Sequence, residues 1–156
     1  MQRTIDLPLE DIPVVDEHGM LVLAPQEKVW DALLETVPKA FSGAVTKRVA
    51  RALGCSETES SGEAGEIGST FPGFVVARVV EPAVLALEGQ HRFARYGLLF
   101  SVEPTKDEQT LLRAETRADF PGMKGSVYRT LVIGTRGHVV VVKRLLDAVK
   151  RRAERG

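Results

Sequence analysis

The side chains best suited to chemistry in this sequence are histidines and tyrosines set among apolar residues. His138 lies in the apolar run that ends at Val142, and His91 and Tyr96 flank a short connection between two expected strands. A neutral imidazole in apolar surroundings can hydrogen-bond a ligand or transfer a proton near neutral pH. The hydroxyls of Tyr96 and Tyr128 need partners if the rings are buried. Each of these side chains either faces a ligand or fills the core, and the sequence leaves both interpretations open.

A row of alternating charges offers a second kind of chemistry. Arg113, Glu115 and Arg117 share one face of an expected strand, and Leu112 and Ala114 lie on the other. If the charged face lined a cavity, it would bind a polar or anionic ligand and polarise a carbonyl group. The small apolar residues of the opposite face suit an interior better. We therefore expect the charged face to point to solvent.

Other chemistries find no support in the residue pattern. The three histidines lack the spacing of metal ligands, Cys55 is the single cysteine, and no phosphate-binding loop, dinucleotide fingerprint or Gly-x-Ser-x-Gly motif occurs. We expect no metal and no cofactor. Basic and acidic residues number 21 each, so no overall field attracts nucleic acid. No secretory signal or membrane span is visible either, which predicts a cytoplasmic protein without stable membrane insertion.

A long amphipathic segment near the end of the chain is the element expected to position these groups. Between Met123 and Arg155, apolar residues recur with helical spacing on one side and basic residues on the other. Local propensity alone favours a different structure: the β-branched runs around Gly134–Gly137 are typical of a hairpin. The continuous apolar stripe from Val127 to Val149 favours the helix, with room for a kink at the glycines.

The rest of the chain predicts an α+β protein, with one domain over residues 1–156. Residues 1–16 are expected to form an extended arm, and residues 17–155 the core. The expected elements are a strand over Glu17–Leu23, a helix from Pro25 that ends at Pro38, a helix over Lys39–Leu53, and strands over Phe74–Glu81, Val84–Phe93, Tyr96–Glu103 and Thr110–Phe120. The polar segment Ser56–Gly68 has nothing to bury and is expected to be a mobile loop, or a lid over a cavity.

The stretch from Val22 to Leu33, with Ala24-Pro25 and Val29-Trp30, resembles the opening of the START-like (SRPBCC) superfamily, which includes polyketide cyclase/dehydrase-like proteins. A second stretch, from Phe120-Pro121-Gly122 to Gly137-His138, is similar to an uncharacterised bacterial branch of these proteins. The resemblance implies a helix-grip fold, in which a curved antiparallel sheet wraps a long C-terminal helix around a cavity. Superfamily members bind lipids, hormones or polyketides, and a few are cyclases, so the fold alone names no substrate.

Together these features predict a binding protein for a small apolar, lipid- or polyketide-like molecule. The expected ligand-binding residues are His138, Tyr96, Tyr128, His91, Phe100 and Trp30. One alternative is a cyclase- or aromatase-like enzyme that acts on an aromatic or polyketide substrate, with His138 or a tyrosine as acid or base. A second is an interaction module without a ligand, such as a homodimer, because Val139 and Val140 lie off the main stripe of the long helix.

Overall fold

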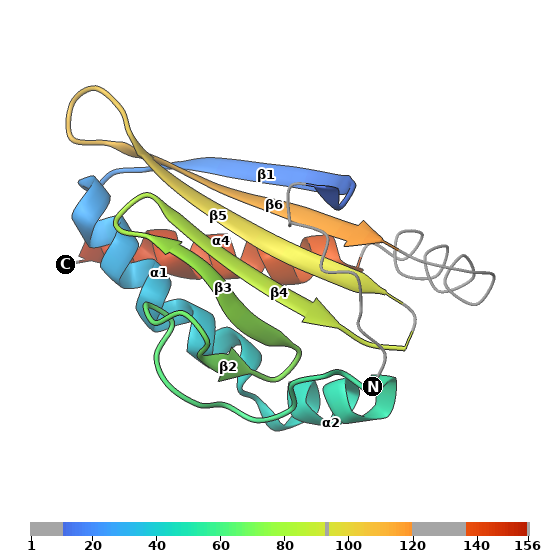
Figure 1. Cartoon of the computed structure of the whole chain (residues 1–156). Coiled ribbons are helices and arrows are strands. Elements are labelled where there is room, and N and C mark those ends of the chain that lie inside the picture. Colours follow the sequence, from blue (N-terminus) through green and yellow to red (C-terminus); the bar gives the residue numbers. More distant parts are fainter. Residues whose placement is uncertain (1–10, 93, 120–136, 156) are drawn as a thin grey trace.

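The computed structural model of the chain describes residues 11–92, 94–119 and 137–155, without the side chains of residues 45, 137 and 138 (Figure 1). The helices and strands are β1 (Val14–Val22), α1 (Gln26–Phe41), α2 (Ala44–Leu53), β2 (Thr70–Phe71), β3 (Phe74–Val80), β4 (Val84–Gln90), β5 (Arg95–Pro104), β6 (Thr110–Asp119) and α4 (Gly137–Arg155). This is the expected α+β order, with two helices after the first strand and a helix at the end.

The strands form one six-stranded antiparallel sheet in the order β1-β6-β5-β4-β3-β2. Short polar turns join β3 to β4 and β5 to β6, which explains why these strands pair as neighbours. Helices α1 and α4 pack against each other and against the sheet, and α2 lies at the end of the sheet where β4 finishes (Figure 1). The sheet therefore has one inner face covered by helices and one outer face.

The alternation of side chains along β5 and β6 is the one expected from the sequence. Leu98, Phe100 and Val102 of β5 are at most 5% exposed, and Ala114 of β6 is fully buried. These residues face α1 and α4 and join the main core. Because side chains alternate along a strand, the residues between them point to the outer face.

Helix α4 confirms the helical interpretation for the part of the segment that the structure describes. Residues 137–142 are helical, so the alternative hairpin over this stretch is wrong. The apolar stripe is buried against the sheet and α1, and its buried members are Val142, Leu145, Leu146, Val149 and Ala153. Val141, expected on the same stripe, is half exposed. The earlier part of the expected helix, residues 123–136, lies outside the described residues.

The expected helix boundary at Pro38 is wrong. Helix α1 continues through Pro38 to Phe41, and the break falls at Ser42-Gly43. Proline removes one backbone hydrogen bond and disfavours a helix interior. Here Pro38 lies in the last turn, and the turn that it begins buries Phe41 in the core. The hydroxyl of Ser42 also donates to the Pro38 carbonyl.

The first strand also starts earlier than expected, at Val14, so the last residues of the expected arm belong to the sheet. Ile12 is 2% exposed and packs on Ala86 and Leu99 of the outer face. The chain is held there because Arg117 donates to the Ile12 carbonyl at 3.0 Å. Residues 1–10 of the expected arm lie outside the described residues.

The segment Ser56–Gly68 contains more fixed contacts than its composition suggests. Ala64 is 1% exposed in the core, and Ser61 pairs with Thr70 through backbone hydrogen bonds of 2.9 and 3.0 Å. Glu59 forms ion pairs with Lys47 and Arg51 of α2 at 2.7 and 2.8 Å. Hydrogen bonds from these two residues lower the pKa of Glu59. The expectation that this segment has nothing to bury is wrong.

The packing of α4 can be tested with Leu146, which is 1% exposed in the core. We expect Leu146→Ala to lower the free energy of unfolding by about 2–5 kcal/mol, because the substitution leaves a void between α4 and the elements it covers. Chemical denaturation monitored by circular dichroism measures this change. Val140→Ala, at a half-exposed position of the same helix, should change the free energy by less than about 0.5 kcal/mol. Equal effects of the two substitutions would contradict the assigned orientation of α4.

Candidate functional site

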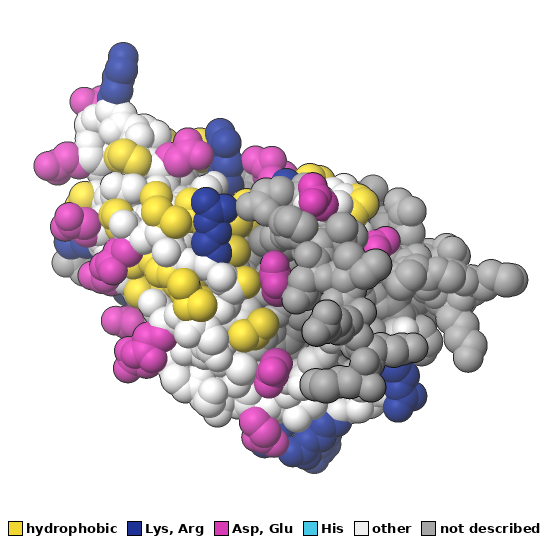
Figure 2. Space-filling model, viewed as in Figure 1, with side chains coloured by type: hydrophobic (Ala, Val, Ile, Leu, Met, Phe, Trp, Pro, Cys, Tyr) yellow, Lys and Arg dark blue, Asp and Glu magenta, His cyan; other side chains and the backbone are white. Residues whose placement is uncertain are grey.

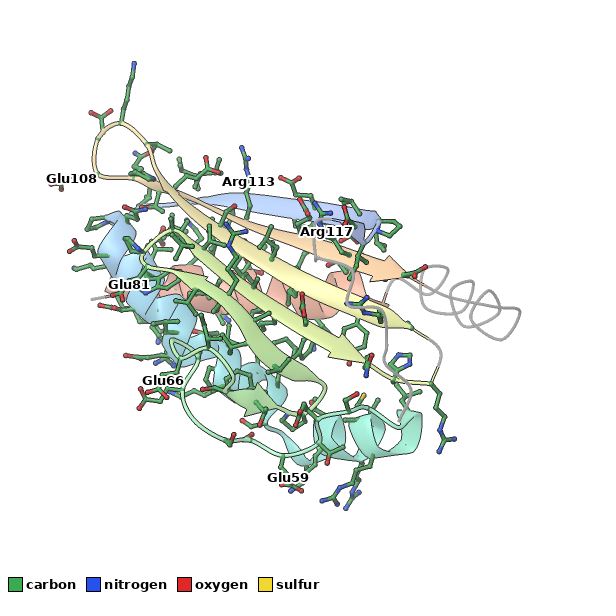
Figure 3. The ribbon with its side chains drawn as sticks, in the orientation of Figure 1. Glu59, Glu66, Glu81, Glu108, Arg113 and Arg117 are labelled. Carbon is green, nitrogen blue, oxygen red and sulfur yellow. The ribbon has the colours of Figure 1, made fainter. Side chains whose placement is uncertain are left out.

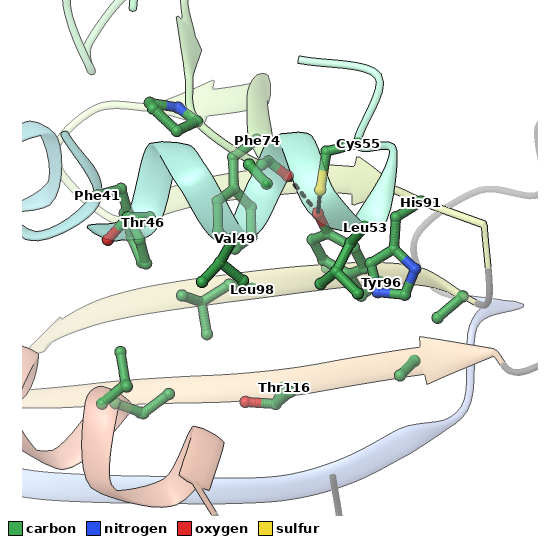
Figure 4. Close-up of a pocket in the computed structure, with 18 of the residues that line it drawn as sticks. Phe41, Thr46, Val49, Leu53, Cys55, Phe74, His91, Tyr96, Leu98 and Thr116 are labelled. Atoms are coloured by element: carbon green, nitrogen blue, oxygen red, sulfur yellow. Dashed lines mark hydrogen bonds between the residues drawn. The ribbon is translucent and has the colours of Figure 1, made fainter. Parts of the chain in front are cut away.

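A cavity of about 470 Å³ lies between α2, the inner face of the sheet and the first half of α4 (Figure 4). Its floor is the end of the sheet where β5 begins and β6 finishes. The residues of this floor are mostly small, including Ala94, Gly97 and Ala118. Helix α4 closes one side with Val142 and Leu145, and α2 closes another. The cavity exists because small side chains leave a space between the sheet and the helices.

One wall of the cavity is a row of four ring side chains (Figure 4). The ring centroids of Phe41 and Phe74 are 4.7 Å apart, and those of Phe74 and Tyr96 are 5.3 Å apart at 81°. The rings of Tyr96 and His91 follow at 5.4 Å. Tilted and edge-to-face contacts at these distances are favourable for aromatic rings. The wall therefore offers a ligand an ordered aromatic surface.

The hydroxyl of Tyr96 is held at the edge of this wall. It donates to the carbonyl of Gly73 at 2.6 Å, and the thiol of Cys55 lies 3.6 Å from its oxygen (Figure 4). Gly73 has a φ of +90°, which favours glycine. The turn between β2 and β3 thus brings its carbonyl to the tyrosine. These contacts fix the orientation of the ring in the cavity.

Gly89 makes room for this arrangement. It pairs with Tyr96 in the register of β4 and β5. A Cβ atom at position 89 would lie 2.0 Å from the carbonyl oxygen of Gly73 and 2.4 Å from the nearest ring carbon of Tyr96. Only a residue without a side chain lets the ring and the turn approach the strand so closely.

The electrostatics of the cavity are those of an uncharged site. No Asp, Glu, Lys or Arg is among the described residues that line it. Partial burial lowers the pKa of His91, so this imidazole is neutral at physiological pH. The polar groups in the walls are therefore hydroxyls, a thiol and a neutral imidazole, supplied by Thr46, Cys55, His91, Tyr96 and Thr116. A charged ligand would find no opposite charge among them.

Helix α2 is tied to the sheet at its C-terminal end. The amide of Arg92 donates to the Leu53 carbonyl at 3.2 Å, and the amide of Ser56 donates to the Gln90 carbonyl at 3.1 Å.

Val49 of α2 and Val141 of α4 both line the cavity, yet each is about half exposed, at 51% and 50%. These two residues mark an apolar mouth between the helices. No residue of the segment Ser56–Gly68 lines the cavity, so the expected lid is not found there.

The charged row on β6 lies outside this cavity, as expected. Arg113 and Arg117 extend from the outer face of the sheet (Figure 3), and the space-filling view shows charged side chains interspersed with apolar ones on this side of the molecule (Figure 2). Arg113 lies 3.7 Å from a carboxylate oxygen of Glu17 and 3.8 Å from one of Glu103. Arg117 pairs with Glu115. These charges pair with one another at the surface, away from the cavity.

The structure brings together only some of the residues proposed as ligand contacts. Tyr96 and His91 line the cavity. Trp30 and Phe100 do not, because they are 1% and 0% exposed in the core. His138 lies in the first turn of α4, but its side chain is outside the described part of the structure, and so is Tyr128.

The contribution of α2 to the cavity was not predicted from the sequence. Thr46, Ala50 and Leu53 lie on the side of α2 that faces the cavity, followed by Cys55. The sequence predicted a helix over Lys39–Leu53, but none of its residues was proposed as a ligand contact. Cys55, which was also not proposed as a site residue, contacts Tyr96. Thr116, on the inner face of β6, was also not singled out.

Within the part of the chain that the structure describes, no three His, Cys, Asp or Glu side chains gather in a way that could hold a metal ion. Among the helices that the structure describes, none is both long and apolar enough to span a membrane.

Comparison with known proteins shows similarity in structure. No protein-family model and no curated protein sequence matches the chain. Norcoclaurine synthase from Thalictrum flavum superposes with a TM-score of 0.58 at 14% identity, over 97% of each chain. A conserved protein from Geobacillus kaustophilus gives a TM-score of 0.52 at 14% identity, over 89% of this chain and 94% of that one. The chain has the helix-grip fold of the START-like proteins. At such identities the likeness concerns the fold.

A further helix-grip structure is norcoclaurine synthase in complex with dopamine and hydroxybenzaldehyde, with a TM-score of 0.57 at 15% identity, over 97% of this chain and 95% of that one. The helix-grip arrangement expected from the resemblance is therefore confirmed. The cavity described above lies between the sheet and the C-terminal helix of that fold.

The role of Gly89 can be tested with Gly89→Ala. We expect this substitution to lower the free energy of unfolding by about 1–3 kcal/mol, because the new methyl group collides with the Gly73 carbonyl and the Tyr96 ring. Urea denaturation measures this change. Gly43→Ala is the control, because a Cβ there meets no atom within 4 Å. A Gly89→Ala protein as stable as the Gly43→Ala protein would contradict this account of the tyrosine's position.

The lowered pKa of His91 predicts a pH dependence. Below the ordinary histidine pKa of 6.5, the unfolded chain takes up a proton that the folded chain does not, so stability falls as the pH falls. We expect His91→Gln to reduce the loss of stability between about pH 7.5 and pH 5.5. Urea midpoints at the two pH values measure the difference. The same loss in both proteins would show that His91 does not contribute to it.

Proposed function

We propose that the chain is a binding protein for a small, uncharged molecule that is largely apolar or aromatic, held in the cavity between α2, α4 and the sheet. The observation that carries this proposal is the 470 Å³ cavity with no charged side chain among its described lining residues. Ligand sites typically measure about 300–1,000 Å³ and combine apolar walls with a few polar groups. The cavity fits this description in size and in chemistry.

The aromatic wall narrows the ligand class. Phe74 and Tyr96 meet edge to face, and both present ring surface to the cavity. A ring in the ligand would extend this row of contacts at little entropic cost, because the protein rings are already ordered by their packing. The complex of norcoclaurine synthase with dopamine and hydroxybenzaldehyde supports the same ligand class for a cavity in this fold.

Two other functions have weaker support. A cyclase- or aromatase-like reaction would draw on polar or charged groups in the cavity, and Arg113 and Glu115 lie on the outer face instead. An interaction module would use the half-exposed Val140 and Val141 as a contact surface, but Val141 also lines the cavity mouth.

The proposal places the chain in the cytoplasm, where the thiol of Cys55, free in the structure, would stay reduced.

The test is a fluorescence titration with N-phenyl-1-naphthylamine, an uncharged aromatic probe. We expect the wild-type protein to bind it and Ala118→Leu to weaken binding by at least about tenfold, because the larger side chain occupies the cavity floor. Ala44→Leu is the matched control, since it adds the same atoms at an exposed position of α2 outside the cavity. It should leave the affinity unchanged.

Two results would contradict the proposal. One is a wild-type protein that does not bind the probe. The other is equal affinity in the wild-type and Ala118→Leu proteins, because the probe would then bind outside the cavity. Circular dichroism spectra of the two variants establish that each is folded before affinities are compared.

A further inference from the structure

Thr116 is a polar residue on the cavity floor. Its neighbours on the inner face of β6 are Ala114 and Ala118, and its register partner on β5 is Leu98. Among the described side chains of α4, those that line the cavity are Val141, Val142 and Leu145, and none of these can hydrogen-bond through its side chain. A hydroxyl in these surroundings needs an explanation.

The hydroxyl oxygen of Thr116 is buried and has no hydrogen-bond partner in the part of the chain that the structure describes. Two other polar groups of the cavity wall are paired: the hydroxyl of Tyr96 donates to Gly73, and the thiol of Cys55 contacts that hydroxyl. Asp16 is the register partner of Thr116 on β1, but no hydrogen bond joins the two side chains. A buried hydroxyl without a partner is destabilising, because it has lost its hydrogen bonds to water.

We propose that Thr116 determines ligand specificity: the ligand is an uncharged ring system with a hydroxyl or carbonyl group that hydrogen-bonds the Thr116 hydroxyl. This inference rests on the proposed function. A threonine hydroxyl both donates and accepts, and rotation about χ1 between staggered positions can turn it toward the cavity.

The surroundings of Thr116 disfavour an anionic group. A carboxylate at this position would be desolvated near Asp16, the register partner of Thr116, with no Lys or Arg among the described lining residues. A neutral hydroxyl or carbonyl group satisfies the threonine at a much smaller desolvation cost. The ring that carries it would pack against the wall of Phe74 and Tyr96.

The experiment compares two probes that differ in one hydroxyl group, 2-naphthol and naphthalene, by isothermal titration calorimetry. The measured quantity is the ratio of their dissociation constants, so the general effect of cavity shape cancels. We expect Thr116→Val, which keeps the shape of the side chain and removes the hydroxyl, to reduce the preference for 2-naphthol by about tenfold. Thr116→Ser keeps the hydroxyl and should retain the wild-type preference.

Thr105→Val is the matched control, because Thr105 is exposed in the turn between β5 and β6 and does not line the cavity. It should leave the preference unchanged. An unchanged preference in Thr116→Val, or an equal loss in Thr105→Val, would overturn the inference while leaving the proposed function intact. A wild-type protein that binds neither probe would overturn the proposed function and this inference with it.

Discussion

The apolar contact between α4 and the inner face of the sheet is the interaction on which both the fold and the cavity depend. Along the second half of α4, Leu146, Val149 and Ala153 are buried in one core with residues of α1 and the sheet. Large inner side chains such as Phe100 and Leu112 fill the space under the helix there. Toward the beginning of α4, the facing residues are smaller, and the same two layers leave a cavity between them.

The change in side-chain size along the sheet therefore determines where a ligand can be held. Dense packing at one end stabilises the position of the helix, and the small residues at the other end provide the volume. Helix α2 contributes few contacts to the main core but completes the wall of the cavity. The densely packed end of the contact between α4 and the sheet thus stabilises the fold, and the end with small residues holds the cavity.

The order of the strands and helices could be predicted from the sequence because it depends on the periodic spacing of apolar residues. Alternation along β5 and β6 correctly assigned Phe100 to the inner face and Arg113 to the outer face, and the helical stripe identified α4 from its buried residues. Local signals were less reliable. Pro38 indicated a helix end, but burial of Phe41 in the core outweighs the lost hydrogen bond. The polar composition of residues 56–68 concealed the buried Ala64.

The site was less predictable than the fold, because periodicity shows which face is buried but not whether that face is filled. Trp30 and Phe100 carry the same sequence signal as Tyr96, yet they lie in the packed core and Tyr96 lines the cavity. The difference arises from glycines at positions 73 and 89, which come close to Tyr96 only in three dimensions. The missing hydrogen bond of Thr116 likewise depends on neighbours from several strands and a helix.

The most direct test of a void between α4 and the sheet is a crystal structure of the protein under xenon pressure, because xenon occupies apolar cavities and scatters strongly. We expect a xenon site in contact with Phe74, Leu98 and Val142. If no xenon bound there and the side chains of Leu98 and Val142 met across the floor, the account of this protein as a cavity-bearing helix-grip protein would be contradicted.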